Sequence, residues 1–144
     1  MRLASGRGVR AVRGTAERLP FAAGAFGAVL VVATICFADD SAMLLREVRR
    51  VLRPGGKLVL GVVPLDSAWG RSYDDKRRSG HYFYRVVRLL TLALHRRLLE
   101  RTGFKLTDVR STLLQAPGEA LVDEPVREGF VPGAGFVALE ARAP

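Results

Sequence analysis

Residues 46 to 61, REVRRVLRPGGKLVLG, constrain the fold more strongly than any other part of this sequence. Apolar residues recur in this region at the spacing of one buried helical stripe: Leu44, Val48, Val51 and Leu52. Pro54 cannot continue the helix, and Gly55 and Gly56 allow a turn with positive φ. The apolar run from 57 to 63 follows at once and indicates a buried strand. The stretch therefore predicts a helix and a strand joined by a tight turn.

A second apolar run precedes this helix. Residues 28 to 35, AVLVVATI, are rich in β-branched side chains and do not alternate with polar ones, which is typical of a parallel strand buried on both faces. Three candidates for the helix N-cap follow it: Asp39, Asp40 and Ser41. Glu47 and Arg50 are spaced for an ion pair on the helix. Because a strand–helix–strand crossover lays its two strands parallel, we expect an α/β fold.

The remaining segments are assigned from the same kinds of pattern. Residues 1–8 are expected to end a helix that Gly8 stops, and Val9–Arg13 to form a short strand. The polar segment 66–84 is too long for a plain connector and is expected to be a lid or a mobile loop. A helix over 85–101 and strands over 104–114 and 135–141 follow, so we expect one domain over residues 1–144.

Composition excludes some classes of protein and leaves others open. The single cysteine, Cys36, excludes an internal disulfide and a cysteine-based zinc cluster, and no His–acid pair has metal spacing. The longest apolar run is too short to span a bilayer, so we expect a cytoplasmic protein without a membrane partner. The net charge is +9, with nine basic residues between Arg71 and Arg101. We interpret these as a solvated face; an anionic ligand and nucleic acid are the alternatives.

Three segments in order resemble the class I S-adenosylmethionine-dependent methyltransferases: GTAERLPF (14–21), LLREVRRVLRPGGKLVLG (44–61) and LLERTGF (98–104). ICFADD (35–40) and DSAWG (66–70) resemble a subgroup of small bacterial and archaeal methyltransferases, and the resemblance covers essentially the whole chain. It implies a Rossmann-like sheet in which 28–35 is the family's fourth strand. It also implies S-adenosylmethionine as cofactor and a small molecule as methyl acceptor.

The resemblance further implies which residues meet the cofactor. Thr15, Ala16 and Glu17 would form the adenine side, and Ala33, Thr34 and Ile35 the exit of the fourth strand. Thr15 stands where relatives often carry an acid, but its hydroxyl can still accept a hydrogen bond. Methyl transfer from an activated sulfonium depends mainly on binding, orientation and exclusion of water. No catalytic acid or base is therefore assigned, and no metal is expected.

One part of the family pattern is missing from the sequence. No G-x-G-x-G follows a strand, and no second strand ends in a ribose-binding acid, so we expect the sheet to lack the family's strands 1 and 2. The chain would then correspond to the C-terminal two-thirds of the family domain and bind the cofactor weakly, if it is active at all. The strand over 28–35 would have an unpaired apolar edge. We expect Val9–Arg13 or a second chain, in a homo-oligomer, to cover that edge.

Several side chains allow more than one interpretation. Five aromatic residues are candidates for a substrate lid: Trp69, Tyr73, Tyr82, Phe83 and Tyr84. His81 is expected in an exposed loop, with a general base as the alternative, while His95 is expected at the surface and Cys36 as a packed thiol. The Asn/Asp-Pro-Pro-aromatic motif of base-methylating enzymes is absent after 28–35, so nucleic acid is not the expected acceptor. The alternative functions are a non-catalytic methyltransferase-like protein that completes its sheet with a partner chain, and a basic nucleic-acid-binding module.

Overall fold

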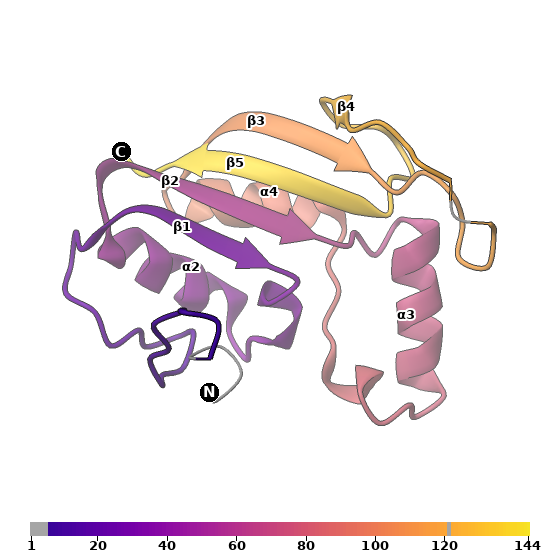
Figure 1. Ribbon diagram of the computed structural model, residues 1–144, viewed down its shortest axis with the longest axis horizontal. Coiled ribbons are helices and arrows are strands. Elements are labelled where there is room, and N and C mark those ends of the chain that lie inside the picture. Colours follow the sequence, from indigo (N-terminus) through magenta and orange to yellow (C-terminus); the bar gives the residue numbers. More distant parts are fainter. Residues whose placement is uncertain (1–5, 121) are drawn as a thin grey trace.

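The computed structural model describes residues 6–120 and 122–144, and this part of the chain forms a five-stranded sheet with helices (Figure 1). The strands are β1 (Phe26–Val32), β2 (Leu52–Val62), β3 (Lys105–Thr112), β4 (Arg127–Glu128) and β5 (Phe136–Arg142). The helices are α2 (Ser41–Val51), α3 (Ala68–Arg78) and α4 (Leu92–Arg101), with 3₁₀ turns η1 (Ile35–Phe37) and η2 (Tyr84–Val86). The α/β class is confirmed, and none of the described helices is long and apolar enough to cross a membrane.

The sheet order is β1-β2-β5-β3-β4. β1 and β2 are parallel, with Ala28 opposite Lys57 and Val32 opposite Gly61, as the crossover predicted. β5 lies between β2 and β3 and is antiparallel to both. β1 lies at one edge of the sheet, and because it is parallel to β2, the carboxyl ends of these two strands lie at the same end of the sheet.

The β1–α2–β2 unit forms as its sequence predicts. The Asp40 carboxylate accepts hydrogen bonds from Ala42 N and Met43 N, both at 2.9 Å, and caps α2. Gly55 has φ 74°, which the turn after α2 requires. β2 begins at Leu52, earlier than expected, because Leu52 already pairs with Phe26 of β1, and Gly55 N then donates to Ala143 O at 2.9 Å.

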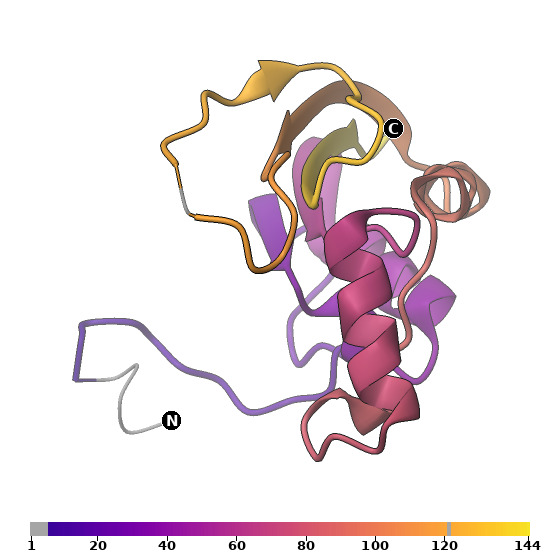
Figure 2. The ribbon, with the colours of Figure 1, turned by 90° about the vertical axis from the view of Figure 1, so that its right-hand side faces the viewer.

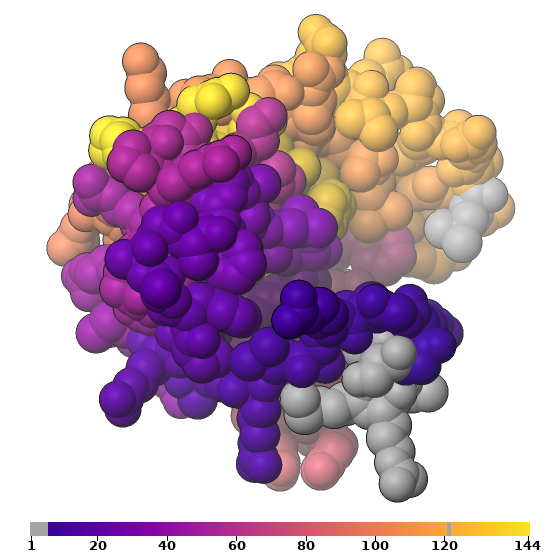
Figure 3. Space-filling model, turned by 60° about the vertical axis from the view of Figure 1, so that its left-hand side comes forward, coloured from indigo at the N-terminus to yellow at the C-terminus, as the bar shows by residue number. Residues whose placement is uncertain are grey.

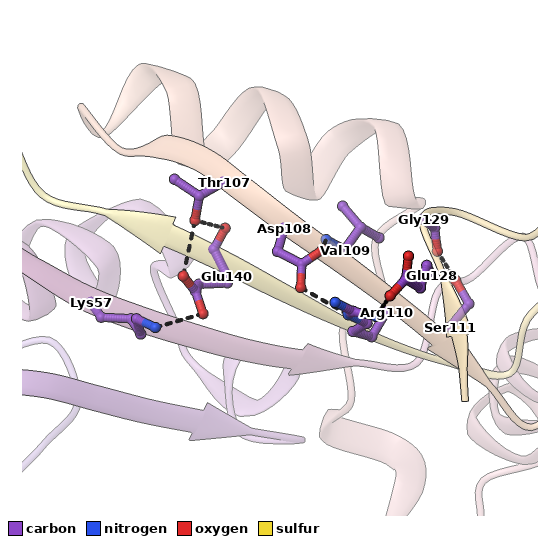
Figure 4. A network of polar contacts seen from close by, with 9 residues as sticks. All are labelled: Lys57, Thr107, Asp108, Val109, Arg110, Ser111, Glu128, Gly129 and Glu140. Carbon is purple, nitrogen blue, oxygen red and sulfur yellow. Dashed lines mark hydrogen bonds and ion pairs between the residues drawn. The ribbon is translucent and has the colours of Figure 1, made fainter. Parts of the chain in front are cut away.

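Helices α2 and α4 cover one face of the sheet (Figures 1 and 2). Six leucine side chains are fully buried in the core that the helices and strands form: Leu44, Leu45, Leu58, Leu60, Leu99 and Leu139. Polar pairs lie along the other face, including Lys57 Nζ to Glu140 Oε2 at 2.9 Å and Arg110 Nη1 to Glu128 Oε1 at 2.6 Å (Figure 4). The hydrophobic core is therefore on the helical side of the sheet.

Two expected elements differ from the structure. Val9–Arg13 forms no strand; it runs as irregular chain away from the sheet (Figures 2 and 3), and its valines are exposed. The expectation that it covers the edge of β1 is wrong, since the segment pairs with no strand. A short strand whose side chains do not pack on a core is only marginally stable. Of the expected helix end over 1–8, residues 1–5 lie outside the described part, and Gly8 has φ 75°.

The segment 66–84 is mostly helix rather than loop. Ser67 Oγ accepts a hydrogen bond from Gly70 N at 2.9 Å and caps α3, and Asp74 pairs with Arg77 and Arg78 one turn along, both at 2.8 Å. The helix expected over 85–101 begins only at Leu92, after the cap Thr91. The Ser67 cap and the Asp74 ion pairs stabilise α3, whose sequence has no apolar stripe.

Candidate functional site

A partly enclosed cavity of about 270 Å³ lies at the carboxyl ends of β1 and β2. Residues of α3, η2, the segment 87–89 and α4 also line it, and the lining is almost entirely apolar. The residues that line it are Ala33, Ile35, Cys36, Phe37, Gly61, Val62, Val63, Tyr73, Phe83, Tyr84, Val87, Leu89 and His95. Ligands of open α/β sheets bind at this end of the strands.

The exit of β1 forms one wall of this cavity through an unusual backbone. Ala33 has φ 47°, the left-handed region that a residue with a Cβ rarely adopts, while its N–H still bonds to Gly61 O at 2.9 Å. The chain then turns into η1, which Arg88 holds: its backbone N–H donates to Cys36 O at 2.8 Å and its guanidinium to Asp39 O at 3.0 Å. Strained backbone of this kind concentrates at functional sites.

Aromatic side chains form the opposite wall. Tyr73 of α3 and Tyr84 of η2 stack with their centroids 4.9 Å apart, and Phe83 contacts Tyr84 and Phe37 edge-on. Burial and the neighbouring Tyr84 raise the pKa of Tyr73, so its hydroxyl is neutral at physiological pH.

Only part of the expected lid set lies at this wall. Tyr73, Phe83 and Tyr84 line the cavity, whereas Tyr82 is 80% exposed. Trp69 lies outside the lining: its Nε1–H donates to Gln115 O at 2.7 Å, so it fastens α3 to the loop after β3.

His95 lies in the cavity lining and is only 3% exposed, so the expectation of a surface position is wrong. Its Nδ1 lies 3.0 Å from Thr91 O, and since a carbonyl oxygen only accepts, Nδ1 carries a proton. Burial lowers the pKa of His95, against smaller opposite effects of Thr91 and Asp66, and so favours the neutral ring. The signal was present in the sequence: Leu92, His95 and Leu99 have i, i+3, i+7 spacing, and all three are buried.

Cys36 is a half-buried thiol in the same lining. Its Sγ lies 3.7 Å from Ala33 O, and burial raises the pKa of the thiol. A protonated sulfur in this position packs against other groups and is a poor nucleophile. In the described residues, no group of three or more His, Cys, Asp or Glu side chains is placed to hold a metal ion.

The expected cofactor residues divide between this cavity and a second hollow. Ala33 and Ile35 line the cavity, while Ala16 and Thr34 line a hollow of about 180 Å³ beside β1, whose walls include Leu30. The structure thus brings the loop over 14–21 next to the exit of β1, and residues 33–35 separate the two spaces.

The other two expected residues, Thr15 and Glu17, line neither space. Thr15 is exposed and forms a one-bridge turn with Arg18. Glu17 Oε1 accepts a hydrogen bond from Asp39 N at 2.9 Å, so this carboxylate joins the loop over 14–21 to the segment before α2.

The loop over 14–21 is fixed to α2 by the predicted ion pair. Glu47 Oε1 lies 2.7 Å from Arg50 Nε, and its other oxygen accepts from Leu19 N at 2.9 Å. Arg50 also donates to Leu19 O at 3.0 Å and to Phe21 O at 2.8 Å. The bond from Arg50, with a smaller effect of Leu19 N, lowers the pKa of Glu47. A charged pair on α2 therefore positions one wall of the second hollow.

The lining of the second hollow is compatible with one side of an adenosyl group. Apolar side chains from the loop over 14–21, from β1 and from α2 line it, and such surfaces take a flat base. The Thr34 hydroxyl donates to Val32 O at 2.8 Å and keeps lone pairs that can accept a further bond. A glycine-rich phosphate-type cradle, the other half of a nucleotide site in this kind of fold, is absent from the sequence.

The chain is similar in sequence and in structure to known proteins. Residues 2–60 match the family "Methyltransferase domain". The crystal structure of "SAM-dependent methyltransferase, possible histamine N-methyltransferase" from Thermotoga maritima superposes with a TM-score of 0.91 at 36% identity, covering 99% of this chain and 68% of that one.

Two curated relatives extend the comparison. Rv2003c of Mycobacterium tuberculosis is 41% identical over 136 residues, which are 94% of this chain and 48% of that protein. MJ1123 of Methanocaldococcus jannaschii is 30% identical over 140 residues, which are 97% of this chain and 67% of that protein. The chain thus spans about half the length of the first of these relatives.

Proposed function

Because this chain belongs to the family of S-adenosylmethionine-dependent methyltransferases, we propose that it takes part in methyl transfer from S-adenosylmethionine to a small-molecule acceptor. The observation that supports the proposal most directly is the partly enclosed, largely apolar cavity beside the exit of β1. It adjoins the hollow expected to take the adenosyl group, with only residues 33–35 between them. Two adjacent sites, one for the donor and one for the acceptor, are what the reaction needs.

We propose that Ala16 and Thr34 contact the cofactor in the second hollow, with Thr15 at its rim, and that Ala33 and Ile35 face the reacting end. Glu17 acts indirectly in this proposal, because its carboxylate holds the backbone of Asp39. When bound, the cofactor supplies a methyl group already activated by its sulfonium, so the chain contributes orientation and a dry site.

The size and lining of the cavity support a small acceptor rather than a nucleic acid. Basic side chains between Arg71 and Arg101 are partly engaged within the chain: Asp74 pairs with two arginines, and Arg88 with Asp39. Lys76 Nζ lies 5.3 Å from the Tyr84 ring centroid, over the aromatic wall. We therefore place the acceptor in the cavity and expect no nucleic-acid partner.

Calorimetric titration of this chain with S-adenosylmethionine tests the proposal. We expect weak binding, with a Kd of about 0.1–1 mM because the glycine-rich cradle is absent from the sequence, and we expect Ala16→Glu to weaken it at least tenfold, because the carboxylate would be buried against an apolar wall. Arg13→Ala, at an exposed position outside the hollow, is the control. A folded chain that shows no binding at millimolar cofactor would contradict the proposal and would favour the non-catalytic alternative.

A further inference from the structure

We propose that the cavity binds a small aromatic acceptor that carries a hydroxyl or uncharged amino group, and that Nε2 of His95 accepts a hydrogen bond from that group. This inference rests on the proposed function, since it names the class of acceptor. It adds a ligand-binding role for a residue that the sequence pattern alone placed at the surface.

The first step is the orientation of the His95 ring. Nδ1–H donates to Thr91 O, which fixes the tautomer and leaves the lone pair of Nε2 free. No other hydrogen bond to this ring occurs within residues 6–120 and 122–144. No side-chain nitrogen or oxygen in that part of the chain is both enclosed and unpaired, so Nε2 is not fully enclosed, and we infer that it faces the cavity that His95 lines.

The second step is the polarity around this nitrogen. The cavity lining consists almost entirely of aliphatic and aromatic side chains, and the Cys36 thiol is protonated. The carboxylate of Asp66, which acts on His95, accepts a hydrogen bond from Leu92 N at 3.2 Å and is not part of the lining. An acceptor in an apolar space is best satisfied by a neutral donor, because a cationic ligand would lose its hydration with no carboxylate in the lining.

The third step is size and shape. Engineered cavities of about 150 Å³ bind benzene, so a cavity of about 270 Å³ has room for one substituted ring or a small bicycle. The stacked pair of Tyr73 and Tyr84 and the edge-on Phe83 offer flat surfaces to such a ring. A flat ring with one hydrogen-bond donor fits both the aromatic walls and Nε2.

The test compares two probes that differ by one hydroxyl, 4-methylphenol and toluene, in the absence of cofactor. Titrations followed by ¹H–¹⁵N spectra of the chain should show 4-methylphenol binding about tenfold more tightly than toluene, the effect of one hydrogen bond. His95→Asn keeps a donor near Thr91 O and removes Nε2, so the tenfold preference should disappear while toluene binding is unchanged. His95→Gln, which can place an amide oxygen near the Nε2 position, should restore part of the preference.

A second measurement needs no variant. The ¹⁵N resonance of Nε2 in the wild-type chain should shift on addition of 4-methylphenol and stay unchanged with toluene. Equal affinity for the two probes, or a preference that survives His95→Asn, would overturn the inference. If the chain binds no cofactor but keeps its preference for 4-methylphenol, the proposal of methyl transfer fails and the inference about His95 holds. The failures of the two proposals can therefore be told apart.

Discussion

At the scale of single residues, His95 is expected to make stability depend on pH. Its pKa in the folded chain is lowered by burial, while in the unfolded chain it is about 6.5. The unfolded state therefore binds more protons between these two values. The contribution of the neutral ring is complete above about pH 6.5 and is lost as the pH falls through the folded pKa. We expect the free energy of unfolding in urea to decrease from pH 7 to pH 5, and to decrease less in His95→Asn.

The matched control is Leu94→Asn, because Leu94 is 45% exposed on the same helix and has no titratable group. The difference between its free energy of unfolding and that of the wild type should be the same at every pH. Parallel profiles for wild type and His95→Asn would show that His95 does not titrate differently in the folded chain.

Residues whose roles depend on nearby sequence were predicted from it. Asp40 caps α2, Gly55 takes positive φ, and Glu47 pairs with Arg50, all within one or two turns of chain. The burial of His95 could not be predicted in this way, because α4 has apolar residues on two of its faces. The packing of α4 against β3 and β5 selects the face with Leu92 and Leu99.

At the scale of elements, the position of α3 depends on Gly70. A Cβ at this position would overlap Pro64 O and lie 2.7 Å from Leu65 Cα, both of them backbone atoms that cannot rotate away. We expect Gly70→Ala to reduce the free energy of unfolding by about 3 kcal/mol, the upper part of the usual range for overpacking. Urea denaturation followed by circular dichroism measures the change, and probe binding in the cavity should weaken with it, since α3 carries Tyr73.

Gly80→Ala is the control at the other end of α3. Its φ is 77° and no atom lies within 4 Å of the added methyl group, so only the backbone conformation is penalised, by about 1 kcal/mol. A Gly70→Ala variant no less stable than Gly80→Ala would show that α3 is not held against the segment after β2. The sequence did not predict α3, because its stability comes from a Ser67 cap, ion pairs and this close approach rather than from an apolar stripe.

At the scale of the whole molecule, the sequence specifies the strand–helix–strand unit of the sheet but not what covers the edge of β1. The strand–helix–strand unit follows from periodicity, and β5 and β3 continue the sheet through pairs far apart in the chain. Within residues 6–120 and 122–144, β1 has a neighbour on one side only. Leu30 and Val32 on this strand are 69% and 46% exposed, so the apolar edge foreseen from the sequence is present in the described chain.

An unpaired apolar strand tends to recruit another strand, and we propose that two copies of this chain associate through β1. Sedimentation velocity over a range of concentrations should show a reversible increase in mass. Leu30→Lys should weaken this association about tenfold or more, because burial of a leucine contributes about 1.5–3 kcal/mol and a lysine opposes close approach of two edges. Val126→Lys is the control, since Val126 is also exposed but precedes β4 at the opposite edge of the sheet. A chain that remains monomeric at its highest soluble concentration, or associates equally well with Lys at position 30, would show that the edge of β1 is not where copies meet.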